Sequence, residues 1–314
     1  MAVLHTDPLQ GLVIVTSDIR IWSGGVKLTR EGDLSTVRDK LPPSAMVSDG
    51  RKNLVKPSAL APFHAIRKRL ERLLSRQGFR LMSDAFAVPE AEIDSIIREM
   101  DTLEEEFNEA VPVFLNDLPA HYQAQMDEFP EWSEQLKSGQ LEESKVAERL
   151  RFSAGVYKIA PPDPVNAESK LNRQYSNVVN SAVPALLNDI AAKAETLLKG
   201  PVGKRQCVTQ VQHAQVRKLV ERLEAFSFLD YRVGPTAEAL TSMLDCVPRL
   251  GSLTPGNTAV IRVVVEQLAD PETLLEVFEA SDEPVNDANT VSPVDQPAVQ
   301  VPVTAPSTPA FVGV

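Results

Sequence analysis

Two neighbouring segments of opposite charge, residues 60–77 and 89–114, constrain the fold of this chain more than any other feature. In both segments apolar residues recur every three or four positions, which is the period of an α-helix with one buried face. Two such helices can bury their apolar faces against each other and place compatible charges along the rim. The sequence therefore predicts a long amphipathic helix pair, with one basic and one acidic member.

The residues that carry this pattern divide into buried stripes and charged surfaces. The first stripe comprises Leu60, Phe63, Ile66, Leu70, Leu73 and Leu74. The second comprises Ile93, Ile96, Ile97, Met100, Leu103, Phe107, Val111 and Phe114. The rest of the first helix carries Arg67, Lys68, Arg69, Arg72 and Arg76, and the rest of the second carries Glu90, Glu92, Asp94, Asp101, Glu104, Glu105, Glu106 and Glu109.

Strand patterns surround this helix pair. Residues 12–22 alternate between apolar and polar side chains, and residues 26–28 could return beside them as a short hairpin partner. Residues 79–88 and 151–159 are also expected to be extended, whereas residues 42–56 look irregular. We expect the basic helix to run from an N-cap at Ser58 to Gly78, and Pro112 and Pro119 to kink or end the acidic helix.

The second half of the chain has a more helical pattern. Helices are expected over residues 167–199, with an interruption at Pro184, then over residues 206–228, after Pro235, and over residues 260–268. The predicted fold class is α+β and predominantly α-helical: a long amphipathic helix pair with a small antiparallel sheet, followed by a helical bundle. The expected domains are 1–160 (α+β), 161–280 (helical) and 281–314, a disordered Pro/Val-rich acidic tail.

The formal charge of −11 argues against indiscriminate binding of nucleic acid or of an anionic membrane by the whole molecule. A local basic surface can still act, because salt screens charges beyond about 8 Å. Two cysteines, Cys207 and Cys246, are too few for a disulfide framework. No signal peptide and no apolar run long enough for a membrane span is found, so we expect a cytoplasmic protein.

The sequence contains no recognisable catalytic, cofactor-binding or metal-binding motif. Residues 200–204 (GPVGK) lack the spacing of a phosphate loop and follow a helix, so a turn is expected there. The four histidines are scattered, and His64, which lies beside the apolar stripe of the basic helix, is expected to be packed or hydrogen-bonded. Cys207 and Cys246 are expected to be small buried residues. These observations predict a protein that is not an enzyme and needs no cofactor.

The basic cluster Arg67, Lys68, Arg69, Arg72 and Arg76 has two interpretations. In the functional one, these cations contact the phosphates of a nucleic acid, because guanidinium groups match phosphate oxygens. In the structural one, they pair with the acidic helix or cover a solvated face. The structural interpretation is favoured because the acidic partner follows so closely in the sequence.

Several segments, in this order and spacing, carry a family resemblance. They are DIRIWSGGVKL (residues 18–28), LPPSAMVSDGRKNLVKPSALAPFHAIRKRLERLLSRQGFRL (41–81), FAVPE (86–90), FPEW (129–132) and LEAFSFLDYRV (223–233). Through them the chain resembles the bacterial and phage domain-of-unknown-function family numbered thirty-one fifty. The resemblance spans most of residues 10–250 and implies no activity and no catalytic residue.

The resemblance does imply a context. Relatives are encoded in bacteria, phages and conjugative elements, some of them near genes for a MoxR/CobS-like AAA+ ATPase and a CobT-like von Willebrand A protein. This chain has no P-loop, and residues 33–36 (DLST) only half match a metal-binding D-x-S-x-S motif. We therefore expect a non-enzymatic scaffold that is an adaptor or substrate of such an ATPase system, with homo-oligomerisation left open. The alternative is a nucleic-acid-binding accessory factor of a mobile element that uses the basic helix.

Overall fold

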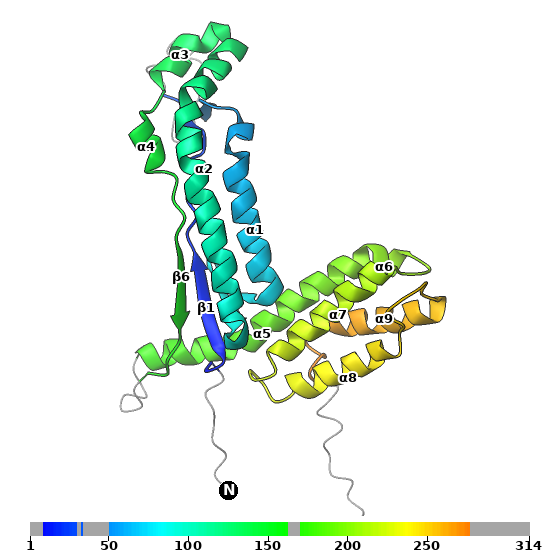
Figure 1. The fold of residues 1–314 in the computed structure, drawn as a ribbon. Helices are drawn as coiled ribbons and strands as arrows, with labels where there is room; N and C mark the ends of the chain where they lie inside the picture. The colour runs from blue at the N-terminus through cyan, green and yellow to red at the C-terminus, as the bar shows by residue number, and fades with distance from the viewer. Residues whose placement is uncertain (1–8, 30–32, 34–49, 163–169, 277–314) are drawn as a thin grey trace, which may run out of the picture.

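The computed structural model describes residues 9–29, 33, 50–162 and 170–276, which form an L (Figure 1). One limb, here called the arm, contains the strands and helices α1–α4. The other limb, the base, contains helices α5–α9, and α5 passes beneath the lower end of the arm. The expected tail, residues 281–314, lies outside the described residues.

The elements follow the predicted order closely. The strands are β1 (Leu12–Ser17), β2 (Gly25–Lys27), β3 (Arg51–Asn53), β4 (Phe79–Met82), β5 (Ala85–Pro89) and β6 (Ala154–Lys158). The helices of the arm are α1 (Ala61–Gln77), α2 (Ile93–Glu128), α3 (Ser133–Ser138) and α4 (Glu143–Ala147). Those of the base are α5 (Lys170–Lys199), α6 (Pro201–Lys204), α7 (Gln210–Ala225), α8 (Val233–Asp245) and α9 (Pro255–Leu268).

A four-stranded antiparallel sheet joins the arm to the base. Its order is β4-β5-β1-β6, so strands far apart in the sequence pair with each other. Successive side chains of a strand point to opposite faces. Val13 and Val15 of β1 accordingly face the core of α1 and α2, while Leu12 and Ile14 face the core that includes α5. The sheet is thus the middle of three layers and belongs to both hydrophobic cores.

The helix pair closes as predicted. Phe63 of α1 packs edge-on against Phe107 and Phe114 of α2, with ring centroids 5.0 and 5.6 Å apart. These rings are buried, as are the aliphatic residues of the α1 stripe from Leu60 to Leu74. The predicted fold class, α+β and predominantly α-helical with a small antiparallel sheet, is confirmed.

The short hairpin expected between residues 12–22 and 26–28 was wrong. β2 pairs with β3 in a separate two-stranded sheet. β3 lies in the segment 42–56, which was expected to be irregular. Trp22 is buried and packs against Phe114 and Tyr122 of α2. This contact directs the chain after β1 along the arm and away from β1. Gly24, at φ 72°, then turns the chain, and its carbonyl oxygen accepts hydrogen bonds from the backbone N–H groups of Leu54 and Val55.

The prolines do not end their helices. α2 runs through Pro112 and Pro119, and α5 runs through Pro184. A proline inside a helix costs about 3 kcal/mol, whereas burying one large apolar side chain contributes about 1.5–3 kcal/mol. The buried side chains around the two prolines of α2 outweigh that cost; they are Phe107, Phe114, Leu115, Leu118 and Tyr122. Ser58 is not a helix cap either, because a 3₁₀ turn, Pro57–Leu60, precedes α1.

The base is a bundle built around α5, α7, α8 and α9. Thr209 and Thr254 cap α7 and α9 through capping boxes, which satisfies the first backbone N–H groups of each helix. The helix expected at residues 260–268 is confirmed within α9. The expected domain boundary near residue 160 stays a prediction; the core that contains α5 also contains Leu12, Ile14 and Phe79 from before it.

Candidate functional site

The basic residues of α1 divide into three groups by their position around the helix. Arg69 and Arg76 lie on the side next to α2. Both guanidinium Nη atoms of Arg69 bind the Glu106 carboxylate, one of them at 3.0 Å, and Arg76 lies 3.7 Å from Glu99. This Glu106 bond is the main reason that the pKa of Arg69 is raised. These two arginines follow the structural interpretation.

Lys68 and Arg72 occupy the crest of α1, opposite its buried stripe. Both are exposed, and neither makes an ion pair with any residue that the structure describes. Arg67 lies on the other shoulder, where its Nη2 atom is 3.4 Å from His64 Nδ1. Burial, followed by repulsion from Arg67 and Lys68, lowers the pKa of His64. This half-buried histidine of α1 lies beside the buried stripe and contacts Arg67, as expected.

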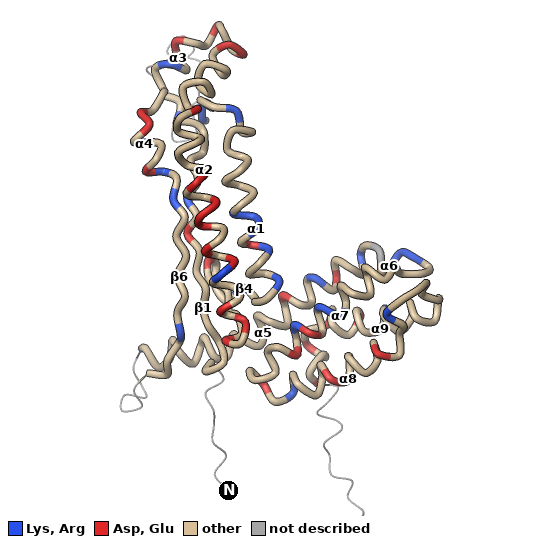
Figure 2. Tube along the Cα trace, viewed as in Figure 1, with Lys and Arg blue, Asp and Glu red and all other residues tan. Residues whose placement is uncertain are grey.

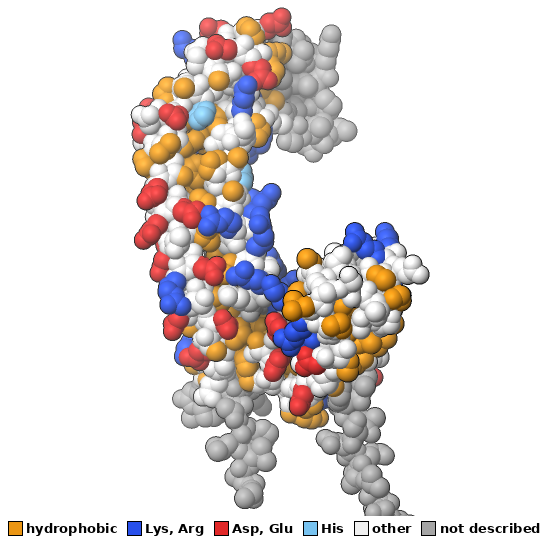
Figure 3. All heavy atoms as spheres, turned by 45° about the vertical axis from the view of Figure 1, so that its right-hand side comes forward, with side chains coloured by type: hydrophobic (Ala, Val, Ile, Leu, Met, Phe, Trp, Pro, Cys, Tyr) orange, Lys and Arg blue, Asp and Glu red, His pale blue; other side chains and the backbone are white. Residues whose placement is uncertain are grey.

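The charge separation between the two helices persists in three dimensions. In Figure 2, red segments follow α2 and blue segments follow α1 along the arm. Figure 3 shows basic side chains gathered at the inner bend of the L, with hydrophobic side chains exposed higher on the arm. Of the five predicted contact residues, the structure thus leaves Lys68 and Arg72 free and engages Arg69 and Arg76 with α2.

A largely apolar groove, here called the furrow, lies between α1 and α2. Its volume is about 650 Å³. One part is bounded by the Arg69–Glu106 pair, and another by His121, whose ring stacks on Phe114 at 5.5 Å. Val113 is 64% exposed although it is apolar. The other apolar lining residues are Ala59, Pro62, Phe63, Ala65, Ile66 and Ala110.

A partly buried charge cluster, the junction cluster, fixes the lower end of α1 to the base. It consists of Asp189 and Lys193 of α5 and Arg222 of α7. Arg222 donates to the Asp189 carboxylate and to the carbonyl oxygen of Gly78, and Lys193 donates at 2.8 Å to the carbonyl oxygen of Ser75. Cations that bind the last carbonyl groups of a helix stabilise its C-terminus.

Burial sets the electrostatics of the junction cluster. Desolvation lowers the pKa of Arg222, and the Asp189 carboxylate opposes this shift. Desolvation and then repulsion from Arg222 lower the pKa of Lys193, again against Asp189. This cluster was not predicted from the sequence. The available signal was that Arg222 falls three residues after Leu219 and four before Phe226, on the buried face of α7.

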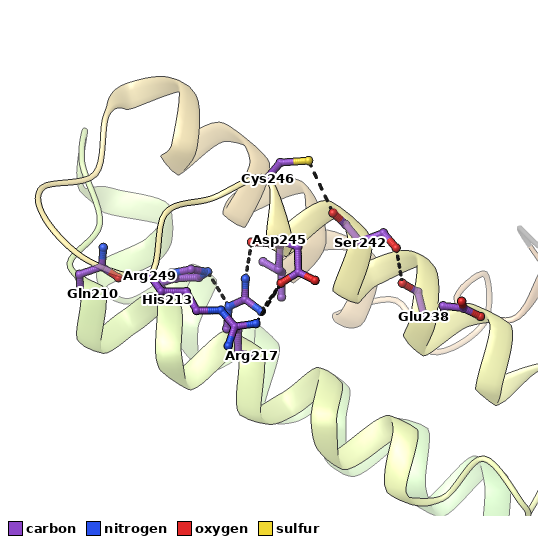
Figure 4. Close-up of polar contacts among 9 residues, drawn as sticks. Gln210, His213, Arg217, Glu238, Ser242, Asp245, Cys246 and Arg249 are labelled. Carbon is purple, nitrogen blue, oxygen red and sulfur yellow. Dashed lines mark hydrogen bonds and ion pairs between the residues drawn. The ribbon is translucent and has the colours of Figure 1, made fainter.

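A second polar cluster lies between α7 and α8 (Figure 4). Arg217 donates to His213 Nε2 at 3.1 Å and to Asp245 at 2.9 Å, and Arg249 also reaches Asp245 at 3.1 Å. Burial, followed by repulsion from Arg217 and Arg249, lowers the pKa of His213. A histidine that accepts from an arginine at Nε2 is a neutral ring with its proton on Nδ1, 3.4 Å from Gln210 Oε1.

The cysteines do not behave as expected. Both Cys207 and Cys246 are exposed, so their expected burial was wrong. Cys246 is the C-cap of α8, where its thiol faces solvent beside the Ser242 carbonyl oxygen, 3.6 Å away. Cys207 lies in the connection between α6 and α7. In Figure 4, Arg217 and Asp245 lie between His213 and Cys246, so this cluster does not form a thiol–imidazole pair.

Residues 200–204, expected to form a turn, contain the single-turn helix α6. In the part of the chain that the structure describes, no three His, Cys, Asp or Glu side chains converge as metal ligands. The same part contains no helix of the length and apolarity that crossing a bilayer requires. The expectation of no catalytic, cofactor or metal residues remains a prediction.

These features define a class: an α+β protein in which one antiparallel sheet lies between a charge-segregated helix pair and a helical bundle. The family model described as "Protein of unknown function (DUF3150)" matches residues 9–270. The chain belongs to this family, as the resemblance implied. Comparisons with curated proteins and with solved structures give no match.

Proposed function

We propose that this protein is a non-enzymatic interaction scaffold that serves as an adaptor or substrate of a MoxR-type AAA+ ATPase, with a von Willebrand A protein as a further partner. The furrow is the observation that carries this proposal. It exposes Val113 and neighbouring small apolar residues on a helix pair whose own core is already closed. Exposed apolar surface of this kind marks sites where proteins bind each other.

The shape of the furrow favours a helix as the bound element. Its lining on α2 extends from Glu106 to His121, which is about 22 Å at 1.5 Å per residue. Small side chains, Ala59, Ala65 and Ala110, allow the backbone of a helix to approach closely. Glu109 and Asp117 supply an acidic border, so a partner helix with a basic flank fits best. The choice of a MoxR-type ATPase as the partner rests on the gene neighbourhood that the family resemblance implies.

Co-purification tests the scaffold proposal. The chain is expressed with the MoxR-type ATPase of its own locus, with ATP or a non-hydrolysable analogue present. We expect the two proteins to associate, and Val113→Asp to reduce the recovered ATPase at least tenfold. The matched control is Leu250→Asp, which changes an 87% exposed leucine of the base and should leave recovery unchanged. No association of the wild-type protein would contradict the proposal.

Nucleic-acid binding by the crest of α1 is the second candidate function. It is favoured by the exposed, unpaired positions of Lys68 and Arg72. Binding should weaken with salt, with a slope of roughly −0.9 in log K per log salt for each phosphate contacted on duplex DNA. Lys68→Glu with Arg72→Glu should abolish it, whereas Lys137→Glu with Lys145→Glu on α3 and α4 should not. Absence of retained DNA or RNA at low salt would exclude this function.

A further inference from the structure

A cavity of about 560 Å³, here called the cleft, lies where the β4–β5 hairpin ends beside β1. β1 pairs with β5 only as far as Thr16 and Ala85. The chain after β1 continues beside the segment that leads into β6. The cleft is lined by Thr16–Ile19, by Arg67, Leu70 and Glu71 of α1, and by the hairpin residues Arg80, Asp84 and Phe86; Ser153, Ala154, Gly155 and Tyr157 complete it.

The edge of the chain beyond β1 has unused backbone groups on its cleft side. The N–H groups of Asp18 and Arg20 donate to the carbonyl oxygens of Ser153 (2.7 Å) and Arg151 (2.8 Å), on the β6 side. Alternate residues of a strand direct their backbone groups to opposite sides. The N–H and C=O of Ile19 therefore point to the β5 side, where no described residue hydrogen-bonds to them.

The cleft passes through the plane of the sheet. Leu70 and Phe86 belong to the core that α1 covers. Thr16 and Gly155 are register partners whose side of the sheet also carries Tyr157, and that side faces away from α1. A cavity that touches both faces of a sheet beside a free strand edge occupies the place of a missing strand.

We propose that the cleft binds an extended peptide segment of a partner protein, which adds to the sheet antiparallel to β1 and in line with β5. The backbone of Ile19 identifies the occupant, because its N–H and C=O complement another extended backbone. The peptide residue opposite Ile19 points to the α1 side of the sheet, where Arg67, Glu71 and Arg80 line the cleft above the buried Leu70 and Phe86. Its neighbours point toward Tyr157 and solvent, so recognition rests on the peptide backbone.

This inference rests on the proposed role as an interaction scaffold, and it names a second class of partner segment at a site away from the furrow. The probe is a heptapeptide selected from a phage-displayed random library against the full-length chain and then synthesised. Its binding is measured by fluorescence anisotropy, and its position by amide hydrogen exchange of the wild-type protein.

We expect the bound peptide to slow exchange of the Ile19 amide at least tenfold. The Arg20 amide is an internal control, because it is already bonded to Arg151 and should not change. Ile19→Pro removes the N–H that faces the cleft and should weaken binding at least tenfold. Glu71→Trp fills the cleft from α1 without altering the strand and should do the same, whereas Glu104→Trp on the exposed surface of α2 should have no effect.

A library that yields no binding peptide, or a bound peptide that leaves Ile19 exchange unchanged, would overturn the inference. So would a peptide whose affinity survives Glu71→Trp. These failures are distinguishable from failure of the scaffold proposal, because association with the ATPase is tested at Val113 in the furrow. If the wild-type chain associated with the ATPase but bound no peptide, the scaffold would stand and the cleft would be removed.

Discussion

At the scale of single residues, Asp189 is the carboxylate that two buried or half-buried cations share. Asp189→Ala leaves Arg222 and Lys193 facing each other without a counter-charge at the junction. Removing one partner of a buried ion pair typically costs about 3–5 kcal/mol, so we expect the free energy of unfolding to fall by about that amount.

Lys193→Met is the matched comparison, because it removes one of two repelling cations and leaves the Asp189–Arg222 pair intact. Its loss should be the smaller of the two. Urea denaturation of both variants measures the difference. Equal losses of unfolding free energy in the two variants would contradict the role of Asp189 as the shared counter-charge.

His213 gives the protein a specific response to acid. Its pKa in the folded protein is lowered from the ordinary value of 6.5 by burial and by Arg217 and Arg249, with Asp245 as the nearby counter-charge. As the pH falls below about 6.5, the unfolded chain binds a proton at this position that the folded chain does not bind. The free energy of unfolding should therefore decrease toward low pH.

His213→Gln keeps an acceptor for Arg217 and removes the titration, so the slope of stability between about pH 6.5 and 5 should become shallower. Denaturant titrations at several pH values measure it. A smaller slope should remain, because the pKa of His64 is lowered in the same direction. An unchanged slope in the variant would show that His213 does not contribute.

At the scale of elements, the apolar seam and the charged rim of the α1–α2 pair contribute unequally. Phe107 is fully buried against Phe63, and truncating such a ring costs about 3–5 kcal/mol. Arg69 and Glu106 are both more than one third exposed, so solvent and salt weaken their attraction. We expect Phe107→Ala to destabilise the protein by a clearly larger amount than Arg69→Ala. Thermal melting of the two variants would reveal the opposite order if charge pairing held the helices together.

The same contrast explains what the sequence could predict. The helices were found because periodic apolar stripes such as Leu60–Leu74 are a local signal. The partner of β2 was not found, because it depends on the burial of Trp22 against α2 and on the Gly24 carbonyl, contacts made across long stretches of chain. For the candidate site, the sequence located the basic residues of α1, but only folded geometry separates the paired Arg69 from the free Lys68. The cleft at Ile19 has no sequence signal, since it arises where a hairpin stops short.

At the scale of the whole molecule, the arm and the base share one sheet. Because β1 contributes Val13 and Val15 to one core and Leu12 and Ile14 to the other, unfolding either core exposes the strand that supports its neighbour. We expect a single cooperative thermal transition, with equal calorimetric and van't Hoff enthalpies. Differential scanning calorimetry measures both. Two separated transitions, with the base melting independently of the arm, would contradict this coupling.

Because β1 contributes to both cores, it also limits how chains of this family can change in length. Inserting or deleting one amino acid within Leu12–Ser17 would exchange the sides to which all later side chains of the strand point, and so would mismatch both interiors at once. Related chains can therefore differ in length before residue 12 or in the connection that leads to β2. Within the strand itself, we expect related chains to contain neither insertions nor deletions at these six positions.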